Sequence, residues 1–263
     1  MMISGKTALI TGASSGIGYE FTSLFAKDGY NLVLVARSEQ QLMQLAQQLE
    51  DKFGISVRVI AKDLSNASAP EEISTELQQA GVTIDVLVNN AGFATYGMFA
   101  EIDLATELQE MQVNMVTLTH LTKLFLPDML KKRWGKILNV ASTAAFQPGP
   151  LMAVYYATKA YVLSFSEALA DELRGTGVTV TTLCPGPTAS GFQERAHVEV
   201  TRLVSSKKIM DAARVARAGY RALIAGKTVV IPGLRNKILA EAVRFSPRKV
   251  VIQVSRSMLE SVH

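Results

Sequence analysis

The sequence predicts an α/β fold, a doubly wound parallel sheet of about seven strands with helices on both faces. Short runs rich in Val, Ile and Leu recur along the chain with little alternation, which is typical of strands buried on both faces. Between them lie longer segments whose apolar residues repeat at helical spacing. Strands that alternate with amphipathic helices imply right-handed βαβ units, and therefore a parallel sheet.

The strands are expected, in chain order, at residues 6–12, 31–37, 57–63, 86–90, 136–141, 178–184 and 228–231. Three segments between them predict the buried faces of helices, formed by Leu42, Leu45, Leu49 and Phe53, by Leu108, Met111, Met115 and Leu118, and by Val162, Phe165, Leu169 and Leu173. Ligands of such sheets bind beyond the carboxyl ends of the strands, so the residues that close each strand form the candidate site.

Length and composition predict one globular domain over residues 1–263. Hydrophobic residues make up 48% of the chain and charged residues 19%, which suffices for one core and argues against disorder. Residues 185–206 contain Gly186, Pro187 and Gly191 and lack clear periodicity, so we interpret them as a loop or lid over the substrate. Residues 234–263 form a basic C-terminal extension.

This extension accounts for the whole net charge of +4. It holds six cations and two carboxylates, namely Arg235, Lys237, Arg244, Arg248, Lys249 and Arg256 against Glu241 and Glu260. An ordinary solvated surface, a dock for an anionic substrate carrier and a contact with an anionic membrane face all fit this pattern. Nucleic-acid binding is not expected, because aromatic interleaving and a recognisable reading motif are absent from the sequence.

No segment predicts export or membrane spanning. A lysine and a glycine interrupt the first apolar run, and the longest uncharged stretch, residues 137–158, contains two prolines. We therefore expect a cytoplasmic protein. Cys184 is expected to be a buried structural thiol. His120 and His197 lack partners at metal-ligand spacing, so no metal site is expected.

A glycine-rich turn, TGASSGIG at residues 11–18, follows the first expected strand and opens the next helix. Glycines allow a tight turn and the close approach of a pyrophosphate, and free N–H groups at the helix start attract negative charge. A P-loop is excluded because no Gly-Lys-Ser/Thr follows. A strand-to-helix turn without a ligand is the alternative. The candidate dinucleotide contacts here are Gly12, Ser14, Ser15, Gly16, Ile17 and Gly18.

The end of the second expected strand indicates NADP(H). A site specific for NAD has an Asp or Glu about 20 residues after the glycine turn, where it binds the ribose 2′-hydroxyl. This chain has Ala36 and Arg37 there, which remove the carboxylate and offer a cation for a 2′-phosphate. An exposed Arg without this role is the alternative interpretation.

The spacing Thr-Gly-x-x-x-Gly-x-Gly resembles the classical short-chain dehydrogenase/reductase family, and later segments match that family in order. They are Asn89-Asn90-Ala91-Gly92, then Asn114, Ser142, Tyr155 and Lys159, then Pro185-Gly186-Pro187-Thr188. The likeness spans about residues 4–233, which we take as the core, and favours the branch that includes 3-oxoacyl thioester and hydroxysteroid reductases. It implies a Rossmann-type fold and an oxidoreductase that uses NADP(H) on CH–OH or C=O groups.

The resemblance implies further cofactor contacts. Asp63, with Leu64, matches the position that contacts adenine, although Asp63 could equally cap the following turn. Asn89 and Gly92 match the adenosine ribose side, and Thr188 matches the contact to the nicotinamide carboxamide. The remaining candidates in the same two segments are Ala91, Pro185 and Gly186.

Tyr155 and Lys159 stand four residues apart near the start of a periodic helix, so their side chains share a face. Tyr156 competes for the tyrosine role, but only Tyr155 has the lysine at i+4 and follows Ser142 by 13 positions. A tyrosine with a pKa of ~10 is a poor base at neutral pH, and a nearby ammonium typically lowers a pKa by about 1 to 3 units. The resemblance implies that Tyr155 is the acid/base, that Ser142 orients the carbonyl, and that Lys159 holds the nicotinamide ribose and tunes Tyr155. It also implies that Asn114 supports a water chain to Lys159.

These features predict an NADPH-dependent reductase that converts a lipophilic ketone or aldehyde to an alcohol. The candidate pocket residues flank the signature positions and are mostly apolar or aromatic: Phe93, Tyr96, Phe146, Met152, Tyr156 and Phe192. An NADP(H)-binding sensor or scaffold with incidental catalysis is the alternative, favoured by tight cofactor binding without carbonyl reduction. The family commonly forms homodimers or homotetramers through two long helices, here about residues 107–126 and 155–174.

Overall fold

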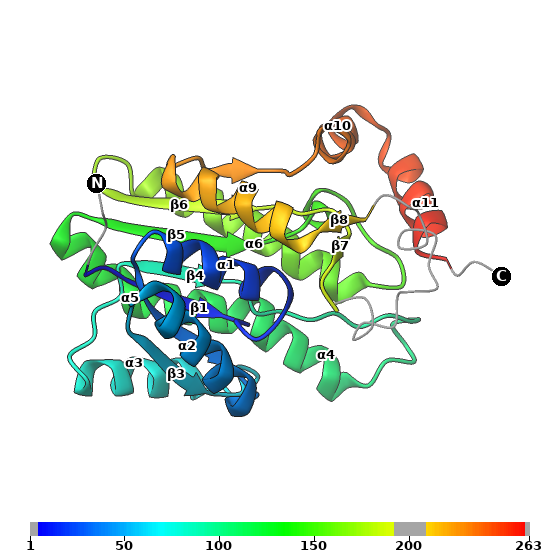
Figure 1. Cartoon of the computed structure of the whole chain (residues 1–263). Helices are drawn as coiled ribbons and strands as arrows, with labels where there is room; N and C mark the ends of the chain where they lie inside the picture. Colours follow the sequence, from blue (N-terminus) through cyan, green and yellow to red (C-terminus); the bar gives the residue numbers. More distant parts are fainter. Residues whose placement is uncertain (1–4, 192–208, 261–263) are drawn as a thin grey trace.

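The structure, a computed structural model, describes residues 5–191 and 209–260. Seven parallel strands form one sheet in the order β3-β2-β1-β4-β5-β6-β9, with helices on both faces (Figure 1). The strand order reverses at the β1–β4 neighbours, the point where doubly wound sheets bind their ligands. The predicted doubly wound parallel fold is therefore confirmed.

All seven expected strands of this sheet are present. Their bounds are β1 Thr7–Thr11, β2 Asn31–Ala36, β3 Val57–Ala61, β4 Val86–Asn89, β5 Gly135–Val140, β6 Val178–Leu183 and β9 Val229–Val230. Every residue of β1 and β4 is buried. The apolar runs in the sequence are therefore unbroken because these strands are covered on both faces, as predicted.

Two layers of helices cover the sheet. Neighbouring strand residues alternate between them, since Ile10 packs with Phe21 and Val215 on one face, while Leu9 packs with Ile73 and Leu121 on the other. The first layer holds α1 Gly16–Lys27, α2 Glu39–Phe53 and α9 Ala212–Ile224. The second holds α3 Ala69–Gln79, α5 Leu118–Lys132 and α6 Ala153–Glu172. The helix faces predicted for α2 and α6 are confirmed, with Phe53 and Phe165 partly buried at their edges.

The face predicted around Leu108 is wrong in its first half. Helix α4 (Leu104–Met111) continues through the π-helical segment η1 (Gln112–Thr117) into α5. Leu108 is 53% exposed and Met111 37%, whereas Glu107 and Glu110 are buried. The wider π-helical turn changes which residues face the sheet. Apolar spacing therefore marked the solvent side of α4.

Only part of the expected loop at 185–206 falls within the described residues. In that part, β7 (Thr188–Ala189) pairs with β8 (Met210–Asp211), which comes later in the chain, and the two form a separate two-stranded sheet. Residues 192–206 lie outside the described part of the chain.

The basic extension folds into two helices, α10 (Leu234–Ala242) and α11 (Arg248–Leu259), joined through the 3₁₀ turn η3 (Val243–Phe245). Figure 1 shows them at one end of the molecule, beyond the strand β9 that leads into α10. Among the described residues, no helix combines the length and apolar character needed to cross a membrane.

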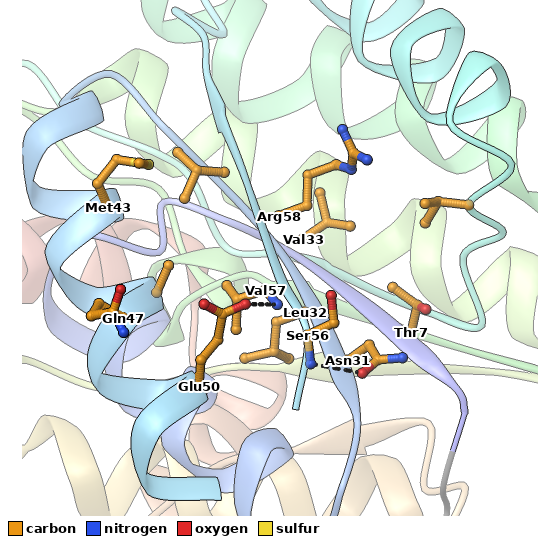
Figure 2. Close-up of a pocket in the computed structure, with 13 residues that line it drawn as sticks. Thr7, Asn31, Leu32, Val33, Met43, Gln47, Glu50, Ser56, Val57 and Arg58 are labelled. Atoms are coloured by element: carbon orange, nitrogen blue, oxygen red, sulfur yellow. Dashed lines mark hydrogen bonds between the residues drawn. The ribbon is translucent and has the colours of Figure 1, made fainter. Parts of the chain in front are cut away.

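An open hollow lies beside the first residues of β1, β2 and β3 (Figure 2). In it the carboxylate of Glu50 accepts a hydrogen bond from the backbone N–H of Val57 at 2.9 Å, and Asn31 accepts one from Ser56 at 3.0 Å. These bonds join α2 and β2 to the start of β3. The hollow is at the amino ends of the strands, opposite the glycine-rich turn, so we place the candidate site elsewhere.

Candidate active site

The glycine-rich turn joins β1 to α1 at the carboxyl edge of the sheet. Gly12 and Gly16 have φ angles of 66° and 55°, which favour glycine. A Cβ on Gly18 would collide with the backbone oxygen of Gly12, so a side chain there would push α1 away from the turn. The Ser15 side chain does not cap α1, whose first turn holds no acidic residue. Backbone N–H groups at this helix start can therefore receive an anion.

The remaining turn residues differ in exposure. Ser14 is half-buried and Ser15 exposed, while Ile17 packs against the core beneath. Ser14 and Ser15 are thus accessible to a ligand, and Ile17 anchors the helix start.

Asn90 braces this turn, a role that sequence reasoning missed. Its side-chain amide donates to the backbone oxygens of Thr11 at 2.9 Å and Gly12 at 3.3 Å. The Thr11 hydroxyl in turn accepts from the backbone N–H groups of Asn90 and Ala91, both at 3.0 Å. The β1 and β4 ends are therefore fixed against each other across the switch point. The Asn-Asn pair in the sequence was the available signal.

Asn89 faces the interior instead. Its amide donates to Asn139 at 2.9 Å and to Thr122 at 3.1 Å, and the residue is 3% exposed. Asn139 continues this buried network to Ser166 at 2.8 Å. The side-chain donors of Asn89 are thus used inside the fold, and a ribose contact from this residue stays a prediction.

Arg37 and Asp63 stand at neighbouring strand ends. Arg37 is exposed just beyond β2. Asp63, which follows β3, accepts hydrogen bonds from the backbone N–H of Ser65 at 3.0 Å and its hydroxyl at 2.8 Å. The backbone bond is the main reason that the pKa of Asp63 is lowered, and the charge of Arg37 contributes. Asp63 therefore caps the following turn, and its contact with adenine stays a prediction. Leu64 is buried next to it.

Tyr155 and Lys159 come together in the first turns of α6. The Lys159 ammonium lies 5.6 Å from the centre of the Tyr155 ring, and the two residues are 9% and 5% exposed. Lys159 donates a hydrogen bond to the backbone oxygen of Val140, the last residue of β5, at 2.9 Å. Burial lowers the pKa of Lys159 to about 8, against the opposing charge of Glu110.

Burial has the opposite effect on the tyrosine. It raises the pKa of Tyr155, and a hydrogen bond with Ser142 opposes the increase. In the protein alone, the effect of burial on the pKa of Tyr155 therefore outweighs the effect of this hydrogen bond. A lowered pKa of Tyr155, expected from Lys159 and a bound dinucleotide, stays a prediction for the complex.

Ser142 follows β5 and begins the 3₁₀ turn η2 (Thr143–Phe146). Its hydroxyl accepts from the backbone N–H of Ala144 at 3.1 Å and donates to the backbone oxygen of Pro185 at 3.4 Å. Ser142 therefore joins the β5 and β6 ends beside Tyr155, with its hydroxyl placed by local turn geometry.

Asn114 lies inside the π-helical segment η1. Its amide donates to the backbone oxygen of Phe93 at 2.9 Å and to the Thr158 hydroxyl at 3.1 Å, and its oxygen accepts from the Phe93 N–H at 3.2 Å. A Cβ on Gly92 would stand 2.9 Å from the Asn114 oxygen and 3.4 Å from the Lys159 ammonium. Asn114 therefore holds the loop after β4 and the helix α6 around Lys159. The predicted four residues are brought to one edge of the sheet.

Glu110 is a buried carboxyl group beside this cluster, and sequence reasoning missed it. Its carboxylate accepts from the Thr95 backbone N–H at 2.8 Å and hydroxyl at 2.9 Å, while Glu107 is 3.4 Å from the same hydroxyl. Burial raises the pKa of Glu110 to about 7, the bonds from Thr95 oppose this, and Glu107 and Lys159 act in opposite directions. Its position at i−4 from Asn114 was the only sequence signal.

The segment after β6 lies against the C-terminal extension. Thr188 is 5% exposed, and its hydroxyl donates to the Gly186 oxygen at 2.8 Å. A Cβ on Gly186 would be 2.5 Å from the side-chain nitrogen of Asn236 in α10. The extension therefore packs directly on the Pro185-Gly186 turn.

The predicted pocket residues separate into three groups. Tyr96, Met152 and Tyr156 share a buried cluster with Tyr155, whereas Phe93 and Phe146 pack against two other clusters. Phe192 lies outside the described residues. The Tyr155 cluster also contains Leu259 of α11, whose backbone oxygen accepts from the Tyr96 hydroxyl at 2.7 Å. This contact from the far end of the chain was not predicted.

Comparison with known proteins gives one family. The model of the short chain dehydrogenase family matches residues 6–200. The very-long-chain 3-oxoacyl-CoA reductase of Homo sapiens is 35% identical over 185 residues, 69% of this chain and 59% of its own length. The ketoacyl reductase HetN of Nostoc sp. is 31% identical over 93% of this chain and 80% of its own. The 17-beta-hydroxysteroid dehydrogenase type 3 of Mus musculus is 34% identical over 69% and 59%.

Solved structures give the same picture. A short-chain dehydrogenase from Sphingobium yanoikuyae in complex with NADPH has a TM-score of 0.82 and 32% identity, covering 91% of this chain and 94% of its own. A bulky-bulky ketone specific alcohol dehydrogenase from Comamonas testosteroni has a TM-score of 0.77 and 31% identity over 91% and 92%. A short chain dehydrogenase/reductase from Burkholderia phymatum in complex with NAD has a TM-score of 0.81 and 28% identity over 100% and 99%.

Proposed function

This chain belongs to the short-chain dehydrogenase/reductase family, and on that premise we propose that it reduces the carbonyl group of a lipophilic ketone or aldehyde to an alcohol with NADPH. The observation that carries the proposal is the buried pair at the start of α6, where the Lys159 ammonium lies 5.6 Å from the Tyr155 ring centre. A phenol and an ammonium held close together in a buried site are suited to proton exchange with a bound substrate oxygen.

The cofactor site fits a dinucleotide. Its pyrophosphate would lie on the uncapped start of α1. Gly12, Gly16 and Gly18 let the chain pack closely enough around this turn to hold its shape. We assign NADP(H) rather than NAD(H) because Arg37 is exposed at the β2 end and can bind a 2′-phosphate. When bound, NADPH supplies a hydride at its nicotinamide ring.

The protein groups have distinct roles in this proposal. Tyr155 donates a proton to the substrate oxygen and takes one back in the reverse direction. Ser142, held by the bond from the Ala144 N–H, turns its hydroxyl proton from the Pro185 oxygen at 3.4 Å to the substrate oxygen and orients it. Lys159 holds the nicotinamide ribose and keeps positive charge near Tyr155. Asn114 is a positioning residue that holds the Gly92 loop beside Lys159.

The substrate class follows from the residues around Tyr155. Tyr96, Met152, Tyr156 and Leu259 pack with Tyr155 in one mostly apolar cluster, which favours a lipophilic carbonyl compound. The names of the relatives support this class, since they refer to 3-oxoacyl-CoA, hydroxysteroid and bulky ketone substrates. The mammalian relatives are longer, and the matched part is 59% of their length.

We also propose a homo-oligomer. Leu104, Leu108, Met111 and Val116 are 69%, 53%, 37% and 48% exposed along α4 and η1, an apolar row that a second copy could cover. Light scattering should give a multimeric mass that falls on Leu104→Ser with Leu108→Ser. A monomeric wild-type protein would contradict this part.

The test of the function is a screen of NADPH oxidation with acyl thioesters, steroids, quinones and aromatic ketones. We expect turnover with at least one bulky carbonyl compound, lowered at least about 100-fold by Tyr155→Phe. NADPH binding is measured separately by its fluorescence. Tight NADPH binding with no turnover across the panel, unaffected by Tyr155→Phe, would instead favour a cofactor-dependent sensor or scaffold.

A further inference from the structure

Helices α10 and α11 present large apolar side chains to solvent. We define the C-terminal surface by the exposed residues Leu234, Ile238, Leu239, Phe245, Val250 and Val254, together with the cations of the extension. Leu234 is 75% exposed, Ile238 57% and Phe245 89%. Isolated exposed apolar residues are ordinary, but so many on two consecutive helices joined through η3 favour a contact surface.

Helix α10 turns its large apolar residues outward. Its single buried residue is Ala240, whereas its Leu and Ile residues at 234, 238 and 239 are all at least half exposed. A surface helix of a globular protein normally packs its large apolar residues inward. Since burial of apolar area stabilises a fold, this orientation forgoes stabilisation within the chain. The outward orientation of these residues is explained if they contact an apolar environment outside the chain.

The charge of the same helices identifies that environment. Glu241 and Glu260 pair with Arg244 at 3.5 Å and Arg256 at 3.4 Å. The other four cations, Arg235, Lys237, Arg248 and Lys249, form no salt bridge within the described part of the chain. Cations placed among exposed Leu, Ile, Phe and Val match a bilayer whose headgroups are anionic and whose acyl region accepts apolar side chains.

Other occupants fit less well. A second copy of the chain would bring like charges together across a two-fold axis, which disfavours association through this surface. The charge of an acidic carrier protein would account for the cations alone, whereas a bilayer also offers an apolar region to Phe245 and to the Leu and Ile residues of α10. Of these occupants, the anionic bilayer suits both the cations and the exposed apolar side chains.

The helices that carry this surface also border the candidate active site. Asn236 of α10 packs on Gly186, and the Leu259 backbone oxygen of α11 accepts from Tyr96 at 2.7 Å. Leu259 itself is fully buried in the cluster around Tyr155. The opposite sides of α10 and α11 thus face solvent and the site. Figure 1 shows both helices at the end of the molecule where β9 ends.

We infer that the C-terminal surface docks the protein reversibly on anionic lipid bilayers. The apolar side chains enter the boundary between headgroups and acyl chains, and the four unpaired cations contact the headgroups. Docking does not depend on the proposed reaction, although it would bring a lipophilic carbonyl compound close to the site if that reaction is correct.

The experiment is co-sedimentation of the full chain with vesicles of phosphatidylcholine alone or mixed with phosphatidylglycerol. Cations near an anionic surface are attracted to it, so we expect binding to mixed vesicles at least about tenfold tighter than to neutral ones, and weaker at high salt. The charge variant is Arg235→Ser with Lys237→Ser, and the apolar variant is Ile238→Ser with Phe245→Ser. Each should lose about tenfold or more in affinity.

Matched controls alter the same residue types elsewhere. Arg217→Ser with Arg221→Ser removes two exposed cations from α9, and Met43→Ser with Ile224→Ser removes two exposed apolar side chains from α2 and α9. These should bind vesicles like the wild type, and circular dichroism with thermal unfolding verifies that every variant folds.

Three outcomes would overturn the inference. The first is no binding of the wild type to mixed vesicles, a result that needs no variant. The second is equal loss in the surface and control variants. The third is concentration-dependent self-association that the surface variants abolish while vesicle binding stays absent. Because vesicle binding is measured without substrate or NADPH, its failure is distinguishable from failure of the proposed reaction.

Discussion

The two ends of the candidate site are built differently. The cofactor end uses backbone groups and exposed side chains, with a glycine-rich turn braced by Asn90 and an exposed Arg37. The catalytic end buries Tyr155, Lys159 and Glu110, each with a pKa moved by burial. Anion recognition needs accessible dipoles and charges, whereas proton exchange near neutral pH needs groups whose pKa values have been shifted. Changes at the two ends should therefore affect different measured quantities.

The largest effect is expected at Tyr155. Tyr155→Phe removes the proposed proton donor and should lower kcat/KM for a bulky ketone by about 10²- to 10⁴-fold, with the Kd of NADPH little changed. Steady-state NADPH oxidation and NADPH fluorescence measure the two quantities. Tyr156→Phe is the control, since its ring centre is 6.0 Å from that of Tyr155 in the same cluster. Equal losses in the two variants would remove the distinction between these tyrosines.

The next effect concerns stability at Glu110. Its folded pKa of about 7 is above its ordinary value, so the stability linked to this group is present at low pH and is lost as pH rises through 7. Above that range the cost of ionising it is on the order of 3 kcal/mol. Glu110→Gln, which stays neutral, should remove this loss from the free energy of unfolding measured by urea at pH 5 to 9.

Glu101→Gln, at an exposed carboxylate before α4, is the control and should leave the pH dependence unchanged. An unchanged profile in Glu110→Gln would mean that Glu110 is ionised throughout in the folded state.

At the cofactor end, Arg37→Ala should change selectivity more than rate. Loss of a charged hydrogen bond to the 2′-phosphate costs roughly 1.5 to 3 kcal/mol, which lowers the preference for NADPH over NADH by about ten- to 150-fold. The ratio of kcat/KM with the two cofactors gives this number. Arg58→Ala removes an exposed cation from β3 and should leave the ratio unchanged. A preserved NADPH preference in Arg37→Ala would exclude Arg37 as its source.

The smallest effect is expected at the contact between Tyr96 and α11. Tyr96→Phe removes the hydrogen bond to the Leu259 oxygen and should destabilise by about 1 kcal/mol, with KM rising more than kcat falls. Tyr161→Phe removes a bond of 2.8 Å to Thr119 at an exposed site and should change neither quantity measurably. A larger effect of Tyr161→Phe would show that burial of the contact is not what matters.

Local sequence signals sufficed to place the glycine turn and Arg37 at one edge of the sheet, while their contacts with a cofactor stay predictions. The β1 strand, the glycine turn and Arg37 follow one another within one βαβ unit, so spacing alone brings them to the same edge. The predicted buried face of α4 was wrong because apolar spacing alone does not tell which side of a helix faces the sheet. The buried side carries Glu107 and Glu110, whose burial depends on donors from Thr95 in a separate loop.

Long-range contacts could not be predicted from the sequence either, because they depend on how distant segments pack together. The bond from Tyr96 to Leu259 joins residues 163 positions apart. The extension was visible as a basic segment, but its division into a side that packs on Gly186 and a side that exposes Leu234 depends on how α10 docks. The family resemblance likewise gave Asn89, whereas the structure uses Asn90 to brace the turn.

The most direct test of the account is the pH dependence of kcat/KM for oxidation of the alcohol product at saturating NADP⁺. Tyr155 must lose its proton to accept one from the alcohol, so the rate should rise with pH and level off above an apparent pKa clearly below the ~10 of free tyrosine. Lys159→Met should raise that apparent pKa by about one unit or more. An apparent pKa at or above ~10 in the wild type would contradict the claim that Lys159 and the dinucleotide reverse the effect of burial on Tyr155.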